Sequence, residues 1–183
     1  MKQIEIYTDG SCKGNPGPGG WCAILLEKNS KKAFEILKGN TFDTTNNRME
    51  MTAVIEALRY IDHHQLHDNE IILYSDSNLV IQTLLQGWKR KANKDLWEEL
   101  DELNESLDIH YQWVKGHAKN YWNNECDKVA QKEADHAKAH PQNFSKSVPK
   151  LIPKIISEEK KSPEKKVSKK NISKKSDSQQ ELF

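Results

Sequence analysis

Residues 2–27, KQIEIYTDGSCKGNPGPGGWCAILLE, hold the pattern that decides the fold. Apolar and polar residues alternate over 2–8, which predicts a strand. The glycine-rich segment 10–20 contains two prolines that exclude a helix, so it predicts tight turns. Strands at 21–27 and 33–41 follow, and the chain is therefore expected to open with an antiparallel meander of three strands.

The rest of the chain adds helices. Thr44, Thr45 or Asn46 can cap a helix that runs to about residue 64, with apolar residues recurring on one face. Further helices are predicted at 77–86, 93–105 and 123–137, and strands at 70–75 and 107–114. The order βββαβααβα, with a strand–helix–strand unit in its middle, predicts an α/β domain with a five-stranded mixed sheet flanked by helices.

Composition limits the chain to one domain. Its 183 residues, 36% of them apolar, can form one modest core but not two. No stretch approaches the roughly 20 consecutive apolar residues of a membrane span, and the N-terminal residues do not form a signal-peptide core, so we expect a cytoplasmic protein without membrane contact. Cys12, Cys22 and Cys126 fit no zinc motif and are expected to be reduced thiols.

Charge divides the chain after residue 137. Residues 1–137 carry 16 Lys and Arg against 22 Asp and Glu, a charge of −6, whereas residues 138–183 carry 12 Lys against 5 acids, a charge of +7. The Lys-, Ser- and Pro-rich composition predicts a disordered basic tail at 141–183 after a domain at 1–140. An acidic domain can bind a polyanion only if metal ions or a basic appendage offset the repulsion.

Four carboxylates and one histidine are candidates for chemistry. Asp9 and Asp76 are placed at the ends of predicted strands, and Glu50 lies one turn into the first predicted helix, on its apolar face. Asp127 lies in the opening turns of the last helix, ten residues after His117. Singly, each has an ordinary interpretation: a turn former, a helix cap, an acid favoured by the helix dipole, or a surface histidine.

Together, these carboxylates form an all-oxygen ligand set around one sheet. Such a set suits Mg²⁺ or Mn²⁺. Oxygen-rich sites that hold two metal ions roughly 4 Å apart catalyse in-line displacement at phosphorus, one ion activating the attacking water and the other stabilising the leaving oxygen. The constellation therefore indicates metal-dependent chemistry on a phosphate ester.

Five blocks in order resemble the ribonuclease HI family over residues 1 to about 137. They are TDGSCKGNPGPGG at 8–20, TTNNRME at 44–50, SDS at 75–77, WVKGHA at 113–118 and NECD at 124–127. Five ordered blocks, each with its chemical residue, are far more specific than one short motif. The resemblance implies a ribonuclease H-like fold and an endonuclease that cuts the RNA strand of RNA/DNA hybrids, leaving 5′-phosphate and 3′-hydroxyl ends.

The resemblance also implies roles for the matched residues. The implied metal ligands, which would hold two Mg²⁺ or substituting Mn²⁺ ions, are Asp9, Glu50, Asp76 and Asp127. His117 would assist proton transfer or product release. The implied contacts to 2′-hydroxyls and sugar edges in the minor groove are Cys12, Asn15, Asn46 and Asn47. Thr45 would seat a phosphate of the DNA strand.

The chain departs from this family in two places. Many bacterial relatives have a Gln two residues beyond the third acid, where this chain has Asn78, a shorter amide for the minor groove. The long basic protrusion of many relatives is reduced here to residues 87–93. Trp88 and the cations at 89–91 could still contact a sugar and the phosphates of the DNA strand, although Trp88 could equally belong to the core.

The last five residues, QQELF at 179–183, resemble the pentapeptide by which bacterial proteins bind the DNA sliding clamp. Gln179, Leu182 and Phe183 would be the contacts, and the alternative is that the terminus ends in Leu-Phe by coincidence. We interpret the chain as a monomeric hybrid-specific endonuclease that serves removal of RNA primers or R-loops. The alternative is a non-catalytic hybrid-binding or clamp-associated adaptor, which has no need for clustered, mutually repelling carboxylates.

Overall fold

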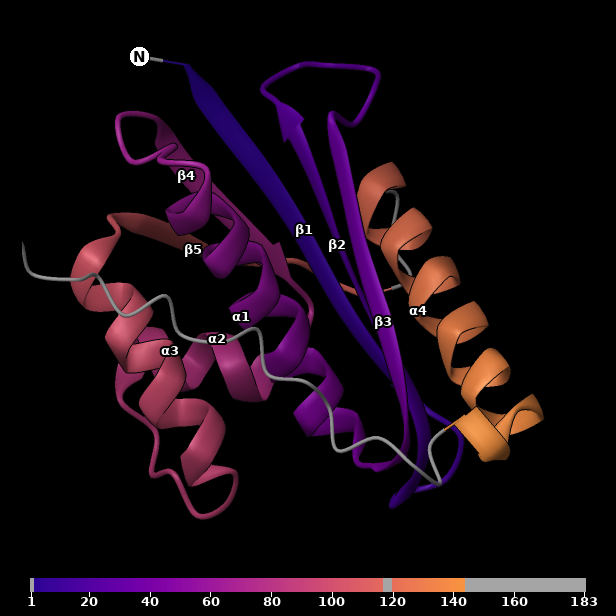
Figure 1. Cartoon of the computed structure of the whole chain (residues 1–183). Coiled ribbons are helices and arrows are strands. Elements are labelled where there is room, and N and C mark those ends of the chain that lie inside the picture. The colour runs from indigo at the N-terminus through magenta and orange to yellow at the C-terminus, as the bar shows by residue number, and fades with distance from the viewer. Residues whose placement is uncertain (1, 117–119, 144–183) are drawn as a thin grey trace, which may run out of the picture. The chain divides into compact units, whose positions relative to one another are not determined.

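The computed structural model describes residues 2–116 and 120–143 (Figure 1). Its elements are β1 (Gln3–Cys12), β2 (Gly17–Glu27), β3 (Glu35–Thr44), α1 (Asn46–His63), β4 (Glu70–Ser75), α2 (Asn78–Gln86), α3 (Lys94–Ser106), β5 (Ile109–Trp113), α4 (Tyr121–Ala139) and a 3-10 turn η1 (Pro141–Asn143). The predicted order of strands and helices is confirmed.

The five strands form one mixed sheet in the order β3-β2-β1-β4-β5. β2 is antiparallel to both β1 and β3, as expected for a meander. β1 is parallel to β4, and β4 is parallel to β5. These parallel pairs need crossover connections, which α1 and the α2–α3 pair provide. The central strand β1 therefore has a hydrogen-bonded neighbour on each side.

Helices cover both faces of the sheet. α1, α2 and α3 lie on one face and α4 lies on the other (Figure 1). Side chains of successive strand residues point to opposite faces. Ile4 and Ile6 of β1 accordingly pack with the α1 side of the core, whereas Tyr7 packs with Cys126 and Ala130 of α4. The sheet is thus the middle layer of three.

Side-chain caps begin α1 and α2, and a glycine ends α2. The Thr45 side chain accepts a hydrogen bond from the Arg48 N–H and caps α1, which decides among the three candidate caps. Ser77 caps α2 in the same way by accepting from the Val80 N–H. Gly87 ends α2 in the left-handed conformation, with φ at 65°, as a glycine after a helix often does.

The predicted turn at 10–20 is wrong at both ends. β1 continues to Cys12 and β2 begins at Gly17, so most of these glycines lie in strands, and Gly20 pairs with Ser11. They are required for close approach: a Cβ at Gly10 would lie 2.2 Å from the Glu50 backbone N, and one at Gly20 would lie 2.4 Å from the Ala134 backbone N. The sequence pattern shows the glycines but not the helices that pack on them.

Gly20→Ala is expected to destabilise the fold by about 1–3 kcal/mol, because the added methyl group would collide with the α4 backbone. The measurement is the free energy of unfolding from urea titration. Gly87→Asn is the matched control, because nothing lies within 4 Å of a Cβ there and Asn tolerates a positive φ. Equal urea midpoints for the two variants would show that α4 can move away from the sheet at little cost.

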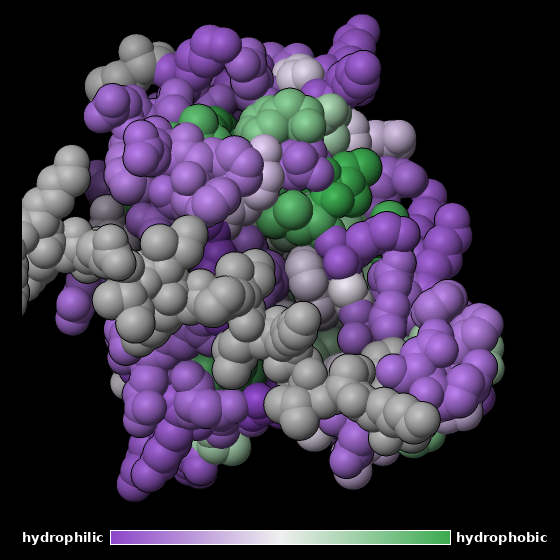
Figure 2. Space-filling model, viewed as in Figure 1, coloured by the Kyte–Doolittle hydropathy of each residue, from purple (hydrophilic) through white to green (hydrophobic). Residues whose placement is uncertain are grey.

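Some large apolar side chains are exposed at the surface of the described part of the chain. The exposed ones are Phe34, Ile36, Phe42, Leu85, Trp88, Trp113 and Tyr121. The face shown in Figure 2 is mostly hydrophilic, with apolar residues gathered in a small area. In the described ranges, none of the helices has the length and apolar character needed to cross a bilayer.

Candidate active site

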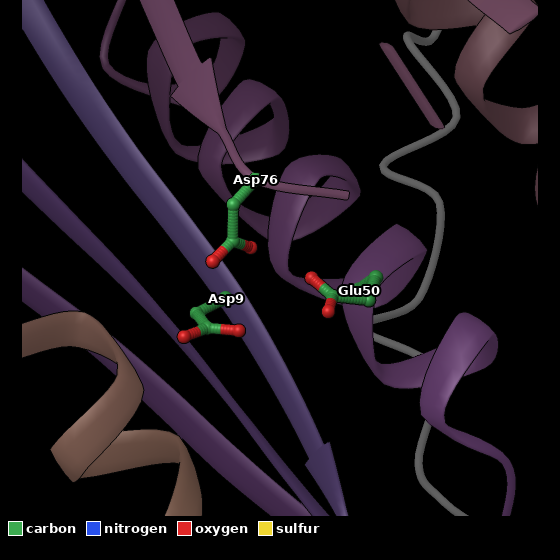
Figure 3. Close-up of side chains that lie close together, drawn as sticks. All are labelled: Asp9, Glu50 and Asp76. Atoms are coloured by element: carbon green, nitrogen blue, oxygen red, sulfur yellow. The ribbon is translucent and has the colours of Figure 1, made fainter. Parts of the chain in front are cut away.

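Three carboxylates from three different elements meet at one place. Asp9 comes from β1, Glu50 from α1 and Asp76 from the residue directly after β4, and Figure 3 shows their side chains directed toward one another. One carboxylate oxygen of each residue lies within 4.8 Å of the others. The sequence places these residues far apart, and the crossover through α1 brings them together.

Asp9 lies inside β1 and not at its end as predicted, since β1 runs on to Cys12. The parallel pairing of β1 with β4 stops at Thr8 and Ser75, and only the pairing with β2 continues. Asp9 is therefore placed where the sheet opens between β1 and β4. One of its oxygens accepts a hydrogen bond from the Gly10 N–H at 2.7 Å, which fixes the carboxylate against the strand.

Glu50 is buried on α1, although carboxylates are rarely buried without partners. Its Oε1 accepts a hydrogen bond from Asn46 Nδ2 at 3.3 Å, one helical turn earlier. Its Oε2 has no hydrogen-bond partner within the described part of the chain. The missing side chain of Gly10 allows α1 to approach β1 closely enough for Glu50 to reach Asp9.

Asp76 is held by three neighbours. Asn123 Nδ2 donates to Asp76 Oδ2 at 3.2 Å, and Trp113 Nε1 donates to the Asp76 backbone O at 3.2 Å. A Cβ at Gly116 would lie 2.5 Å from Asp76 Oδ2, so the turn after β5 packs directly on the carboxylate. We did not predict Asn123, because an amide in the first turn of a helix is usually read as a capping residue.

Burial and neighbouring charges raise the pKa values of Asp9 and Glu50. The pKa of Asp9 rises from 3.8 to about 8, first because burial disfavours the charged form and then because of the charges of Asp76 and Asp127. Burial, followed by the charges of Asp9 and Asp76, also raises the pKa of Glu50 well above its usual range. The group thus carries more negative charge than its surroundings stabilise.

Asp127, the fourth predicted carboxylate, lies on α4 outside this group of three. It is half-buried and accepts a hydrogen bond from Gln131 Nε2 at 2.7 Å, one helical turn later. It is close enough for its charge to raise the pKa of Asp9. Among the described residues, the structure brings three of the four carboxylates together and places the fourth beside them.

These residues fit a divalent cation. The donor set consists of carboxylate oxygens, which are the ligands that Mg²⁺, Mn²⁺ and Ca²⁺ prefer. Glu50 Oε2 is an unpartnered buried oxygen, and unpaired buried acceptors are costly. A bound cation would give this oxygen a partner and would offset both the burial and the mutual repulsion that raise the pKa values of Asp9 and Glu50.

Comparison with known proteins identifies the family of this chain. The model of the RNase H family matches residues 1–135. The chain belongs to the RNase H family. Among its relatives, the "Ribonuclease H" of Thermoanaerobacter sp. (strain X514) is 44% identical over 141 residues, which cover 69% of this chain and 86% of the relative. The "Ribonuclease H" of Chromobacterium violaceum is 42% identical over 144 residues, covering 71% and 93%.

Solved RNase H structures share the fold. The N-terminal RNase H domain of rv2228c from Mycobacterium tuberculosis superposes with a TM-score of 0.67 at 26% identity, covering 77% of this chain and 99% of that domain. LC11-RNase H1, solved in complex with an RNA/DNA hybrid, has a TM-score of 0.65 at 23% identity, covering 74% and 99%. The predicted ribonuclease H-like fold and enzyme class are confirmed, and RNase H enzymes generally use divalent metal ions.

Most of the predicted groove residues of this RNase H lie around the start of α1. Cys12 Sγ donates to the backbone oxygens of Gly17 and Thr44 at 3.4 Å. Asn15 Oδ1 accepts from the Asn46 backbone N–H at 3.2 Å, so the β1–β2 turn is tied to the helix. Asn46 in turn contacts Glu50. These contacts connect the predicted groove directly to the carboxylate cluster.

The remaining groove candidates lie toward α2 and the short segment that replaces the protrusion. Asn78 is exposed at the first residue of α2. Asn47 and Trp88 line a common cavity of about 490 Å³. Trp88 is 43% exposed, which rules out the core alternative.

Arg90 differs from the neighbouring lysines in this segment. Its guanidinium pairs with both oxygens of Asp101 and lies 4.7 Å from the centroid of the Trp97 ring. Its charge is therefore already paired with Asp101 within the fold, whereas Lys89 and Lys91 are exposed. His117 and the tail residues Gln179, Leu182 and Phe183 lie outside the described residues.

Proposed function

We propose that this protein is a magnesium-dependent endonuclease that hydrolyses the RNA strand of RNA/DNA hybrids. The observation that carries the proposal is the cluster of Asp9, Glu50 and Asp76 in a member of the RNase H family. Support for the substrate comes from the relatives named Ribonuclease H and from LC11-RNase H1, whose structure contains a hybrid. A binding protein would gain nothing from carboxylates that repel one another.

The three clustered carboxylates, with Asp127 beside them, would hold two Mg²⁺ ions. With two such ions bound, an oxygen-rich site activates water and stabilises the leaving oxygen at phosphorus, which would give 5′-phosphate and 3′-hydroxyl ends. The protein's own contribution is to hold the ligands in place. The Gly10 N–H fixes Asp9 and Asn46 orients Glu50. His117 would move a proton during the reaction or product release.

Hybrid selectivity would come from contacts to sugars. Proteins distinguish RNA from DNA by contacts to the 2′-hydroxyl, and amides both donate and accept hydrogen bonds. The residues proposed to line the minor groove are Cys12, Asn15, Asn46, Asn47 and Asn78. Thr45 accepts the capping bond at its Oγ1, which leaves its hydroxyl hydrogen to donate to a phosphate of the DNA strand.

Trp88 would pack on a sugar of the DNA strand, with Lys89 and Lys91 at neighbouring phosphates. Arg90 would not contact phosphate, because Asp101 already neutralises it. This assignment differs from the expectation drawn from sequence, in which all three cations were candidates.

The decisive assay uses labelled RNA/DNA hybrid, RNA duplex and DNA duplex, each with Mg²⁺ or with EDTA. We expect cleavage of the RNA strand of the hybrid in Mg²⁺ and intact strands in every other reaction. Binding of the hybrid without cleavage would instead identify the non-catalytic adaptor. Cleavage in EDTA would remove the metal assignment.

The terminal QQELF is proposed to bind the DNA sliding clamp, which would place the enzyme on DNA that carries RNA primers. Ordering a short linear peptide costs free energy, so we expect a dissociation constant in the micromolar range. This corresponds to a binding free energy of roughly −8 kcal/mol. The measurement is calorimetric titration of residues 174–183 into the clamp. A control peptide carries Leu182→Ala and Phe183→Ala, and equal heats from both peptides would contradict the proposal.

A further inference from the structure

Asn123 connects α4 to the carboxylate cluster. It is the third residue of α4, the residue is only 1% exposed, and its Nδ2 donates to Asp76 Oδ2 at 3.2 Å. We propose that Asn123 is a positioning residue of the metal site, which holds the Asp76 carboxylate in the orientation that binds a divalent cation. This inference rests on the proposed metal-dependent function.

The position of Asn123 on α4 supports this role. Residues four apart in a helix lie on the same face, so Asn123 and Asp127 both face the cluster. Asp127 acts on Asp9 through its charge, and Asn123 contacts Asp76 directly. The Asn120 side chain accepts a hydrogen bond from the Asn123 backbone N–H at 3.1 Å and caps the helix there. The Asn123 amide therefore links the α4 face that carries Asp127 to the carboxylate that follows β4.

Packing alone does not explain an asparagine at this position. Its Oδ1 is buried and has no hydrogen-bond partner among the described residues. A buried acceptor without a partner costs free energy, so stability alone would favour an apolar side chain of similar size. The other buried positions of this face of α4, such as Cys126 and Ala130, are indeed small and weakly polar or apolar. The amide donor is the property that sets Asn123 apart.

A neutral donor suits this position better than a charged one. A lysine or arginine would orient Asp76 but would also neutralise its charge and compete with a metal ion. An amide donates to one carboxylate oxygen and leaves the charge in place. Asp76 is also confined by other contacts, because Trp113 Nε1 holds its backbone O and Gly116 packs on the same Oδ2 that accepts from Asn123. Asn123 completes this confinement from α4.

The test compares Asn123→Leu, which removes the donor at similar size, with the wild-type full-length protein. The first readout needs no substrate: the rise of the thermal unfolding midpoint is followed as Mg²⁺ or Mn²⁺ is added. The second is the Mg²⁺ concentration for half-maximal hybrid cleavage. Loss of a group that orients a metal ligand is expected to raise two metal concentrations about 10- to 100-fold. These are the concentration needed for a given rise of the unfolding midpoint and the concentration for half-maximal cleavage. The KM for hybrid at saturating Mg²⁺ should stay within about twofold, because Asn123 is not among the groove residues.

Asn104→Leu is the matched control, since it removes another part-buried amide, the acceptor for the Tyr111 hydroxyl, from a different helix. A merely structural role for Asn123 would lower the unfolding midpoint equally at every metal concentration, as in this control, and would overturn the proposal. If Asn123→Leu does not fold, Asn123→Ala gives the same comparison with the site left open. If the wild-type protein binds metal but leaves hybrid intact, the proposed function fails while the metal titration still decides the role of Asn123.

Discussion

Replacing Asp9 by Asn is expected to slow hybrid hydrolysis by about 10³-fold or more. Metal-assisted charge stabilisation contributes several kcal/mol to such reactions, and every 1.36 kcal/mol changes the rate about tenfold. A carboxylate oxygen of Asp9 lies within 4.8 Å of the ligand oxygens of both Glu50 and Asp76, so Asp9 can share a cation with them. Asn keeps the size of the side chain but removes its negative charge, so the ligand set loses its affinity for the cation.

Hybrid binding should survive this substitution. The groove residues around the start of α1 are tied to one another and to Glu50, not to Asp9. The measurement is single-turnover cleavage in Mg²⁺ together with fluorescence anisotropy of labelled hybrid. Asp68→Asn, an exposed acid in the α1–β4 loop, is the control and should leave both unchanged. Activity of Asp9→Asn within a few-fold of wild type would remove Asp9 from the metal ligands.

The same substitution should stabilise the metal-free fold near neutral pH. The pKa of Asp9 is raised from 3.8 to about 8 in the folded protein, first by burial and then by neighbouring carboxylates. Between pH 4 and pH 8 the folded chain therefore holds a proton that the unfolded chain has released. Because the folded state binds more protons here, the free energy of unfolding must fall as the pH rises through this range. Asp9 causes no loss of stability below pH 4, and the loss is complete and constant above pH 8. Asn does not titrate, so Asp9→Asn is expected to gain roughly 2–5 kcal/mol at pH 8.

The check is urea unfolding in EDTA between pH 4.5 and pH 9. The difference in unfolding free energy between Asp9→Asn and wild type should grow with pH, and Asp68→Asn should run parallel to wild type. Added Mg²⁺ should raise the stability of the wild-type protein and narrow this difference, because the ion binds the folded state. Parallel curves for wild type and Asp9→Asn would mean that the cluster is not strained by its own charge.

Local patterns in the sequence were sufficient for much of the fold. Residues 70–75 were predicted as a strand from their apolar run, and β4 has these bounds. The caps Thr45 and Ser77 and the terminator Gly87 act through contacts within one turn, which a sequence pattern can indicate. The predicted strand ends within 10–20 were wrong because the glycines there allow close contact with helices that are distant in the sequence.

The identities of most site residues could be predicted from the sequence, but their arrangement could not. The carboxylates could be recognised because their blocks resemble those of the ribonuclease HI family, but their mutual distances depend on the crossover through α1. Asn123 could not be recognised, since its partner Asp76 lies 47 residues away and its role depends on the docking of α4. The pairing of Arg90 with Asp101 was also not apparent from the charge pattern alone.

Backbone contacts at glycines, not side-chain volumes, set the spacing of the layers around the site. α1 rests on Gly10 and α4 rests on Gly20, so in both places the main chain of a helix touches the main chain of a strand. Because these two contacts do not involve core side chains, they hold each helix at its height above the sheet whatever the shape of the side chains elsewhere in the core. Core substitutions away from Gly10 and Gly20 are therefore expected to change the stability of the fold more than they move Glu50 and Asp127.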